Sequence, residues 1–287
     1  MLLLEGKKPA APLKNDLARR AKALSDVGRP ATLTAVLVGD DPASHLYLKR
    51  KVRLGASLGI RVEAHILPHQ TTEDELFLLL RRLSTRPDVH GILLEQPLPA
   101  HIRKAAVLEA IDPRKDVDGS TGKVAGLVAG DPTGLAPATP LAVMHLLEFY
   151  QIPLAGREVV IVGHSPVVGR PLALMMLGQD ATVTVCHKAT ADLAFHTRRA
   201  DVLVVATGVP GLITGGMVKP GATVVDVGIN LVDGQTVGDV DWETVCEVAG
   251  AVTPVPGGVG PLTTLLIMAN TLRSAERAPF RERAKVE

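Results

Sequence analysis

Aromatic side chains and cysteines are scarce in this sequence. Only 2% of its 287 residues are aromatic. A stacking platform for single-stranded nucleic acid needs several such rings, so the composition argues against that class of binding surface. Cys186 and Cys246 lie far apart, without the spacing of a zinc site or of a disulfide framework. We therefore expect a protein of a reducing compartment, with no metal site.

An excess of one charge and long apolar runs are missing as well. The 31 Lys and Arg residues nearly balance the 30 Asp and Glu residues, which argues against recruitment to nucleic acid or to a membrane by bulk charge. No run of about 20 apolar residues occurs, and the N-terminal "MLLLEGKKPA" has too few leucines for a signal peptide. We expect a cytoplasmic protein that binds a small molecule.

Strand-like and helix-like segments alternate along the chain, which is typical of an α/β protein with mostly parallel sheets. Residues 32–39 and 61–68 are predicted strands, and residues 45–59 form a predicted helix between them. Thr72 and Glu75 have the spacing of a capping box at the start of the next helix. Since single domains commonly hold about 100–200 residues, the length indicates two lobes.

A dinucleotide-type turn opens the second half of the chain. The strand "VVIVG" turns through Gly163 into a predicted helix, with the spacing G-H-S-x-x-V-G-R-P. Such a turn directs helix N–H groups at a pyrophosphate; Ser165 can cap the helix or bind a phosphate, and Gly169 permits close approach. An ordinary strand–helix turn would share this pattern. The later glycine-ended strands "VVATG" and "VVDVG" favour the nucleotide.

The residues after the next strand bear on which nucleotide binds. NAD sites usually carry Asp or Glu there to bind the ribose 2′-hydroxyl. This chain has Cys186, His187 and Lys188, and a lysine attracts a 2′-phosphate. NADP is therefore favoured over NAD, which is not excluded, while a solvated Lys188 is the alternative interpretation.

Tyr47 and Lys51 are four residues apart in a predicted helix, so they share a face. From the residues alone, a lysine stem lying beside a half-buried ring explains the pair as well as a site does.

Ten stretches in chain order extend this picture over nearly the whole sequence. They are "VGDDPASHLYLKRK", "GILLEQPLP", "DPRKDVDG", "PATP", "VVIVGHSPVVGRP", "VTVCHKAT", "ADVLVVATG", "VVDVGIN", "GDVD" and "VTPVPGGVGPLT". By these stretches the chain resembles the bifunctional methylenetetrahydrofolate dehydrogenase/cyclohydrolase family. The resemblance implies oxidation of 5,10-methylenetetrahydrofolate by NADP⁺ and hydrolysis of the methenyl product to 10-formyltetrahydrofolate, in one-carbon metabolism and purine biosynthesis. It also implies a homodimer.

The resemblance implies a catalytic α/β lobe over 1–138, a Rossmann-type NAD(P)-binding lobe over 139–260, and folate in the cleft between them. A last helix, about 261–280, is expected to pack back on the first lobe. Tyr47 would stack on the folate, Lys51 would be the base or electrostatic group, and Asp118 would anchor the pterin ring. Further folate contacts are expected from Ser44, Pro256, Gly257 and Gly258. Coenzyme contacts are expected from Gly163, His164, Ser165, Gly169, Arg170, His187, Lys188, Thr207, Gly208, Gly228 and Ile229.

Glu95 is the main departure, because the family has glutamine there. Gln96 follows, but neighbouring strand residues point to opposite faces, so it should not substitute for that glutamine. An ionised Glu95 about 4 Å from Lys51 would attract it by about 4 kcal/mol at an effective dielectric near 20. We expect weaker hydrolysis, unless Glu95 itself activates water. The hydride step should suffer less, because a carboxylate stabilises the cation it forms.

Other departures are milder. His164 replaces a family arginine and Lys188 a serine, so the charge for the 2′-phosphate is expected to move from one loop to the other. The stretch "STGKVAGLVAG" differs from the family at the cleft rim. Two other functions stay open: a two-lobed NADP dehydrogenase of a small polar acid, and a folate- or nucleotide-binding protein that has lost its chemistry.

Overall fold

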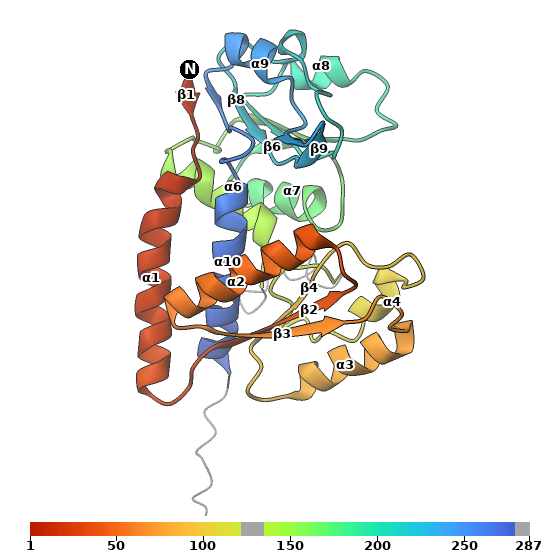
Figure 1. Cartoon of the computed structure of the whole chain (residues 1–287). Coiled ribbons are helices and arrows are strands. Elements are labelled where there is room, and N and C mark those ends of the chain that lie inside the picture. The colour runs from red at the N-terminus through yellow and green to blue at the C-terminus, as the bar shows by residue number, and fades with distance from the viewer. Residues whose placement is uncertain (122–134, 279–287) are drawn as a thin grey trace, which may run out of the picture. The chain divides into compact units, whose positions relative to one another are not determined.

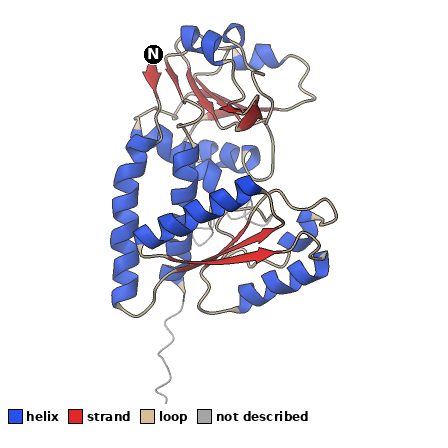
Figure 2. Cartoon of the chain, viewed as in Figure 1, coloured by secondary structure: helices blue, strands red, loops and turns tan. Residues whose placement is uncertain are grey.

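The computed structural model describes residues 1–121 and 135–278 of the chain, so part of the predicted cleft rim and residues 279–280 of the predicted last helix lie outside the described residues. The chain divides into two compact units. Unit 1 comprises Met1–Asn15 and Asp118–Ile267, and unit 2 comprises Asp16–Val117 and Met268–Glu287. In both units helices accompany a sheet (Figure 2). No helix in the described ranges is long and apolar enough to cross a membrane.

Unit 2 contains a three-stranded parallel sheet in the order β3-β2-β4. Its elements are β2 (Thr32–Val38), α2 (Pro42–Leu58), β3 (Arg61–Leu67), α3 (Glu73–Thr85), β4 (Gly91–Leu94) and α4 (Lys104–Leu108). The central strand β2 is wholly buried, as expected for an apolar strand of a parallel sheet. The predicted capping box of Thr72 and Glu75 is present at α3, and α2 ends at Gly59, whose φ is 77°.

The helices α2 and α3 cover opposite faces of this sheet (Figure 1). Leucines of α3 pack with Val36, Ile92 and Leu94 in one apolar core. Side chains alternate between faces along a strand, so the residue that follows Leu94 is directed toward the α2 face. The register therefore aims Glu95 at α2.

Two long helices supply the remaining part of unit 2: α1 (Lys7–Asp26) and α10 (Gly260–Arg277), each with residues in both units. Arg20 on α1 forms two 2.9 Å hydrogen bonds with Glu276 on α10. The buried Asn270 side chain donates to the Val117 carbonyl at 2.9 Å. The C-terminal part of α10 thus packs against residues from the first half of the chain. The helix α1, whose interior contains Pro12, was not predicted from the sequence.

Unit 1 contains a six-stranded parallel sheet in the order β1-β11-β8-β7-β5-β6. Its strands are β1 (Leu2–Leu3), β5 (Glu158–Val162), β6 (Thr182–Cys186), β7 (Val202–Val205), β8 (Thr223–Asp226) and β11 (Ala251–Val252). Its helices are α6 (Ala138–Phe149), α7 (Gly169–Leu177), α8 (Leu193–Thr197), the 3₁₀ turn η1 (Gly215–Met217) and α9 (Trp242–Val248), and the strands β9 (Asn230–Val232) and β10 (Gln235–Val237) form a hairpin.

The order of these strands decides which residues can meet. Numbered in chain order from β5, the strands β5, β6, β7, β8 and β11 of this sheet lie in the order 2-1-3-4-5. This is the second common doubly wound order, and its reversal point lies between β5 and β7. The strand β6 is the edge strand of this sheet, next to β5. The carboxyl ends of β5, β6 and β7 therefore meet at one side, where nucleotides bind in such sheets.

His90 links the stability of unit 2 to pH. Its imidazole is 8% exposed and its Nδ1 accepts a hydrogen bond from the Thr32 amide at 3.1 Å. Burial, aided by Lys115 and Arg29, lowers the pKa of His90 below 6.5. As pH falls below 6.5 the unfolded chain therefore takes up the proton first, and the free energy of unfolding decreases.

We expect His90→Asn to remove this pH dependence, because Asn Oδ1 can accept the Thr32 amide but does not titrate. Urea unfolding of both proteins at pH 8 and pH 5 measures it. The wild type should lose stability relative to the variant at pH 5. Equal losses of unfolding free energy between pH 8 and pH 5 in the two proteins would show that His90 is not responsible.

Candidate active site

Lys51 and Glu95 form a buried ion pair in unit 2. Both Glu95 oxygens accept hydrogen bonds from Lys51 Nζ, at 2.8 and 2.7 Å, and the two side chains are only 13% and 8% exposed. The Glu95 amide donates to the Val36 carbonyl at 2.8 Å, which extends the β4 ladder by one residue. The sheet register thus fixes the carboxylate, and α2 carries the ammonium to it.

The start of α2 and the end of β4 are joined beside this pair. Asp41 caps α2 by accepting from the Ser44 amide at 2.8 Å and from its hydroxyl at 2.6 Å. The Ser44 hydroxyl also lies 3.4 Å from the Gln96 carbonyl, which it can donate to. The Gln96 side chain itself is exposed. Glu95 and not Gln96 therefore meets Lys51, as strand alternation predicts.

Tyr47 lies one turn before Lys51 on α2. Its side chain is 51% exposed, and the Arg50 guanidinium lies 5.6 Å from its ring centroid. An exposed ring offers a face on which a planar ligand can stack. The stacking role of Tyr47 remains a prediction.

Asp118 belongs to unit 1, whereas Lys51 belongs to unit 2. Its Oδ2 accepts a hydrogen bond from the Ser120 hydroxyl at 2.8 Å, and its carbonyl accepts from the Ala138 amide at 3.4 Å. The neighbouring carboxylate, Asp116, is 1% exposed, and its backbone bridges to Ile92. Asp118 is the more accessible of the two carboxylates.

The predicted folate-contact loop Pro256–Gly258 also belongs to unit 1. The Gly257 carbonyl accepts from the Gly6 amide at 2.8 Å, and the Gly258 amide donates to the Pro254 carbonyl at 2.7 Å. Backbone hydrogen bonds thus hold this loop on both sides.

The nucleotide turn between β5 and α7 is tightly packed. A Cβ on Gly163 would lie 2.2 Å from the Ala206 carbonyl oxygen, and one on Gly169 would lie 1.9 Å from the Gly163 oxygen. Ser165 Oγ accepts from the Val168 amide at 3.1 Å, and no side chain caps the start of α7. A helix N-terminus without a side-chain cap suits an anion such as a pyrophosphate. These residues therefore fit a dinucleotide.

His164 and His187 lie together at the ends of β5 and β6, with ring centroids 4.8 Å apart. The turn after β6 is fixed by two hydrogen bonds: the His187 amide donates to Thr190 Oγ1 at 2.9 Å, and the Ala189 amide donates to His187 Nδ1 at 3.2 Å. Lys188 is exposed beside them, and Arg170 is exposed in the first turn of α7. His187 and Lys188 thus occupy the turn after β6, where an NAD site would hold a carboxylate, and His164 and Arg170 come from the segment that follows β5.

A buried carboxylate, Asp239, holds the turn after β7. Its Oδ2 accepts from the Thr207 amide at 2.6 Å, the Thr207 hydroxyl at 2.9 Å and the Gly208 amide at 2.9 Å. Its Oδ1 accepts from Asn230 Nδ2 at 2.8 Å, and the residue is 0% exposed. The predicted coenzyme residues Thr207 and Gly208 therefore owe their position to Asp239.

A second buried carboxylate, Asp226 at the end of β8, holds the turn that follows that strand. Its oxygens accept from the amides of Gly228 at 2.8 Å, Asp239 at 3.0 Å and Val240 at 3.0 Å. Burial nevertheless raises the pKa of Asp226 above its usual range. The next predicted coenzyme residue, Ile229, is 64% exposed. Sequence reasoning gave Asp226 and Asp239 no role, although "VVDVGIN" and "GDVD" contain them.

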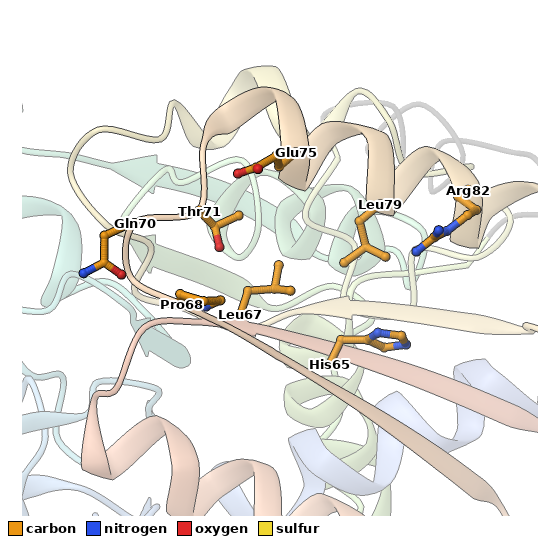
Figure 3. Close-up of a pocket in the computed structure, with 8 residues that line it drawn as sticks. All are labelled: His65, Leu67, Pro68, Gln70, Thr71, Glu75, Leu79 and Arg82. Atoms are coloured by element: carbon orange, nitrogen blue, oxygen red, sulfur yellow. The ribbon is translucent and has the colours of Figure 1, made fainter.

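A cavity of about 560 Å³ opens elsewhere in unit 2, between β3 and α3 (Figure 3). Its lining includes His65, Glu75 and Arg82. His65 pairs with Val36, which faces α3, so the cavity lies on the face of the sheet opposite α2. None of the predicted site residues lines this cavity, and its size alone does not make it the active site. In the described ranges no group of three or more His, Cys, Asp or Glu is arranged to hold a metal.

Comparison with known proteins covers both halves of the chain. The family models "Tetrahydrofolate dehydrogenase/cyclohydrolase, catalytic domain" and "NAD(P)-binding domain" match residues 4–118 and 137–279. The chain is 46% identical over 279 residues to the bifunctional protein FolD of Exiguobacterium sibiricum, which covers 96% of this chain and 99% of that protein.

Solved structures of similar proteins agree. The bifunctional enzyme FolD, methylenetetrahydrofolate dehydrogenase/cyclohydrolase, from Campylobacter jejuni is 45% identical, with a TM-score of 0.93 and coverage of 96% of this chain and 99% of that chain. The methylenetetrahydrofolate dehydrogenase-cyclohydrolase of Trypanosoma brucei, complexed with NADP cofactor and an inhibitor, is 34% identical, with a TM-score of 0.90 and coverage of 96% and 98%.

Proposed function

The chain belongs to the tetrahydrofolate dehydrogenase/cyclohydrolase family, and from this membership we propose its reaction and the residues that perform it. It oxidises 5,10-methylenetetrahydrofolate to the methenyl form with NADP⁺ and hydrolyses that product to 10-formyltetrahydrofolate. The observation that carries the assignment to residues is the buried ion pair of Lys51 and Glu95 in the catalytic part of the chain. The cytoplasm, a homodimer and a supply of formyl groups for purine biosynthesis are further parts of this proposal.

NADP⁺ accepts the hydride. The tight turn through Gly163 and Gly169 and the uncapped start of α7 would hold its pyrophosphate. The basic turn with Lys188 would hold its 2′-phosphate. Thr207 and Gly208, fixed by Asp239, would line the same side of the sheet.

Hydrolysis adds water to the cationic methenyl carbon, and that water must give up a proton. Lys51 can accept it only as the free amine, yet its ammonium protons are directed at both oxygens of Glu95. In this arrangement Lys51 Nζ donates to the carboxylate and offers no lone pair to the water. The hydride step forms a cation, which the same carboxylate stabilises. Tyr47 stacks on the folate and Asp118 anchors its pterin ring.

We expect Glu95→Gln to raise the rate of hydrolysis about tenfold, because an amide leaves Lys51 without a carboxylate partner. The assay gives the enzyme 5,10-methylenetetrahydrofolate and NADP⁺ and follows reduced coenzyme and the methenyl chromophore together. The exposed Glu243→Gln is the matched control. An unchanged hydrolysis rate and pH profile would contradict the role of Glu95, and a lower rate would show that Glu95 itself activates water.

The same assay tests the reaction as a whole. Formation of reduced coenzyme supports the dehydrogenase, and folate binding without turnover of either NADP⁺ or NAD⁺ would identify a binding protein instead.

Lys188→Ala is expected to weaken NADP binding about tenfold, the cost of one charge-assisted hydrogen bond. NAD lacks the 2′-phosphate, so its affinity should stay unchanged. Dissociation constants for both coenzymes measure this effect. Equal losses of affinity for NADP and NAD would show that Lys188 contacts a part that the two coenzymes have in common.

A further inference from the structure

The two histidines at the ends of β5 and β6 are in different states. A backbone amide can only donate, so the hydrogen bond from Ala189 shows that Nδ1 of His187 carries no proton. Nδ1 of His187 therefore serves as an acceptor, which leaves Nε2 as the atom that can donate to a ligand, and a proton on Nδ1 would cost this hydrogen bond. Within residues 1–121 and 135–278, no hydrogen bond engages either ring nitrogen of His164. Both ring nitrogens of His164 are therefore open to a ligand.

The spacing of the rings limits the pair to one added proton. Two imidazolium rings with centroids 4.8 Å apart repel each other, so the second proton is disfavoured. Imidazole is also the side chain that changes charge between pH 5 and 8. A dianionic phosphate placed against this pair would favour a single positive charge, and that charge would reside on His164.

The position of these rings matches the 2′-phosphate. In doubly wound sheets the residue after the second strand contacts the ribose 2′ position. Here that place holds His187 and Lys188, and the adjacent end of β5 holds His164.

We propose that NADP binding is coupled to the uptake of one proton by His164, so that the preference of this chain for NADP over NAD depends on pH. This inference rests on the proposed function, because it concerns the same coenzyme site. His187 stays neutral and donates its Nε2 proton to the phosphate. A histidine pair thus sets coenzyme specificity together with Lys188.

The segments that adjoin His164 also carry charged side chains. Arg170 comes from the start of α7, and Lys188 from the turn after β6. Asp192, further along that turn, caps α8 by accepting from the Phe195 amide at 3.0 Å. The segment 206–210 that leaves β7 carries no charged side chain. Arginine, lysine and aspartate side chains ordinarily keep their charges between pH 6.5 and 8.5, whereas imidazole is the side-chain type that changes charge near this range.

The test measures NADP and NAD affinity of the full chain between pH 6.5 and 8.5, where a 2′-phosphate is mostly dianionic. We expect NADP affinity to fall about tenfold or more across this range, because an opposite charge shifts a protonation equilibrium by about one to three pH units. NAD affinity should stay flat. Calorimetry at pH 7.5 in two buffers of different ionisation enthalpy should show net proton uptake with NADP alone.

Two variants assign the proton. His164→Arg keeps a positive charge at every pH, so the slope and the proton uptake should vanish while NADP still binds at pH 8.5. His187→Asn preserves an acceptor for the Ala189 amide, so its slope should remain. A slope that survives in His164→Arg, or vanishes only in His187→Asn, would overturn the inference. Binding of NADP without any slope refutes the proton coupling alone, whereas no NADP binding at any pH refutes the coenzyme assignment itself.

Discussion

Replacing Lys51 by methionine is expected to slow hydrolysis of the methenyl compound by at least about a hundredfold, the usual contribution of a positioned general base. Methionine preserves the apolar stem of the side chain but cannot accept a proton. Single-turnover decay of the methenyl chromophore measures the effect. Lys49→Met is the matched control, because Lys49 is exposed on the same helix.

The same substitution should also lower the free energy of unfolding by about 3–5 kcal/mol, because it leaves Glu95 as an unpaired buried charge. The double variant Lys51→Met/Glu95→Gln removes that charge, so it should regain most of the stability and none of the hydrolysis. Urea unfolding and the decay assay separate the two effects. A double variant that recovers hydrolysis would show that Lys51 is a structural partner and not the base.

Asp239→Ala is expected to be the most destabilising substitution in the nucleotide-binding part, at about 3–5 kcal/mol. It would remove the acceptor of four hydrogen bonds, which come from Thr207, Gly208 and Asn230, and a hydrogen bond to a charged group contributes about 1.5–3 kcal/mol before relaxation. Coenzyme affinity should fall with it, because the turn after β7 loses its anchor. Urea unfolding and NADP titration measure both losses.

Asp241→Ala provides the comparison for that loss. Asp241 caps α9 by accepting from the Thr244 amide at 3.1 Å, so its removal should cost about 1 kcal/mol. Equal losses in the two variants would show that Asp239 acts only as an ordinary cap.

Local patterns predicted much of the fold. The apolar strands β2 and β5 and the capping box at α3 depend on neighbouring residues, so the sequence displays them directly. Strand alternation predicted that Glu95 and Gln96 point to opposite faces, and the family resemblance indicated which of them lies beside Lys51. These are the features for which one periodicity decides which face a residue occupies.

Other parts depend on contacts that the sequence does not display. The strands β1 and β11 have two residues each and exist only because they extend a sheet built by others. Asp226 and Asp239 are polar residues, and no local pattern shows that the turns around them would surround both carboxylates with N–H donors. The 2-1-3-4-5 strand order is likewise a property of the packed sheet.

The course of α10 has a consequence for synthesis of the protein on the ribosome. Arg29 donates to the carbonyls of Ala275 and Ala278, at 3.0 and 2.6 Å, and the Asn270 side chain donates to the Val117 carbonyl. These partners are among the last described residues to be translated. The unit that begins near the start of the chain therefore cannot complete its contacts while the chain is growing. Its contacts with α10 can form only after α10 has left the exit tunnel.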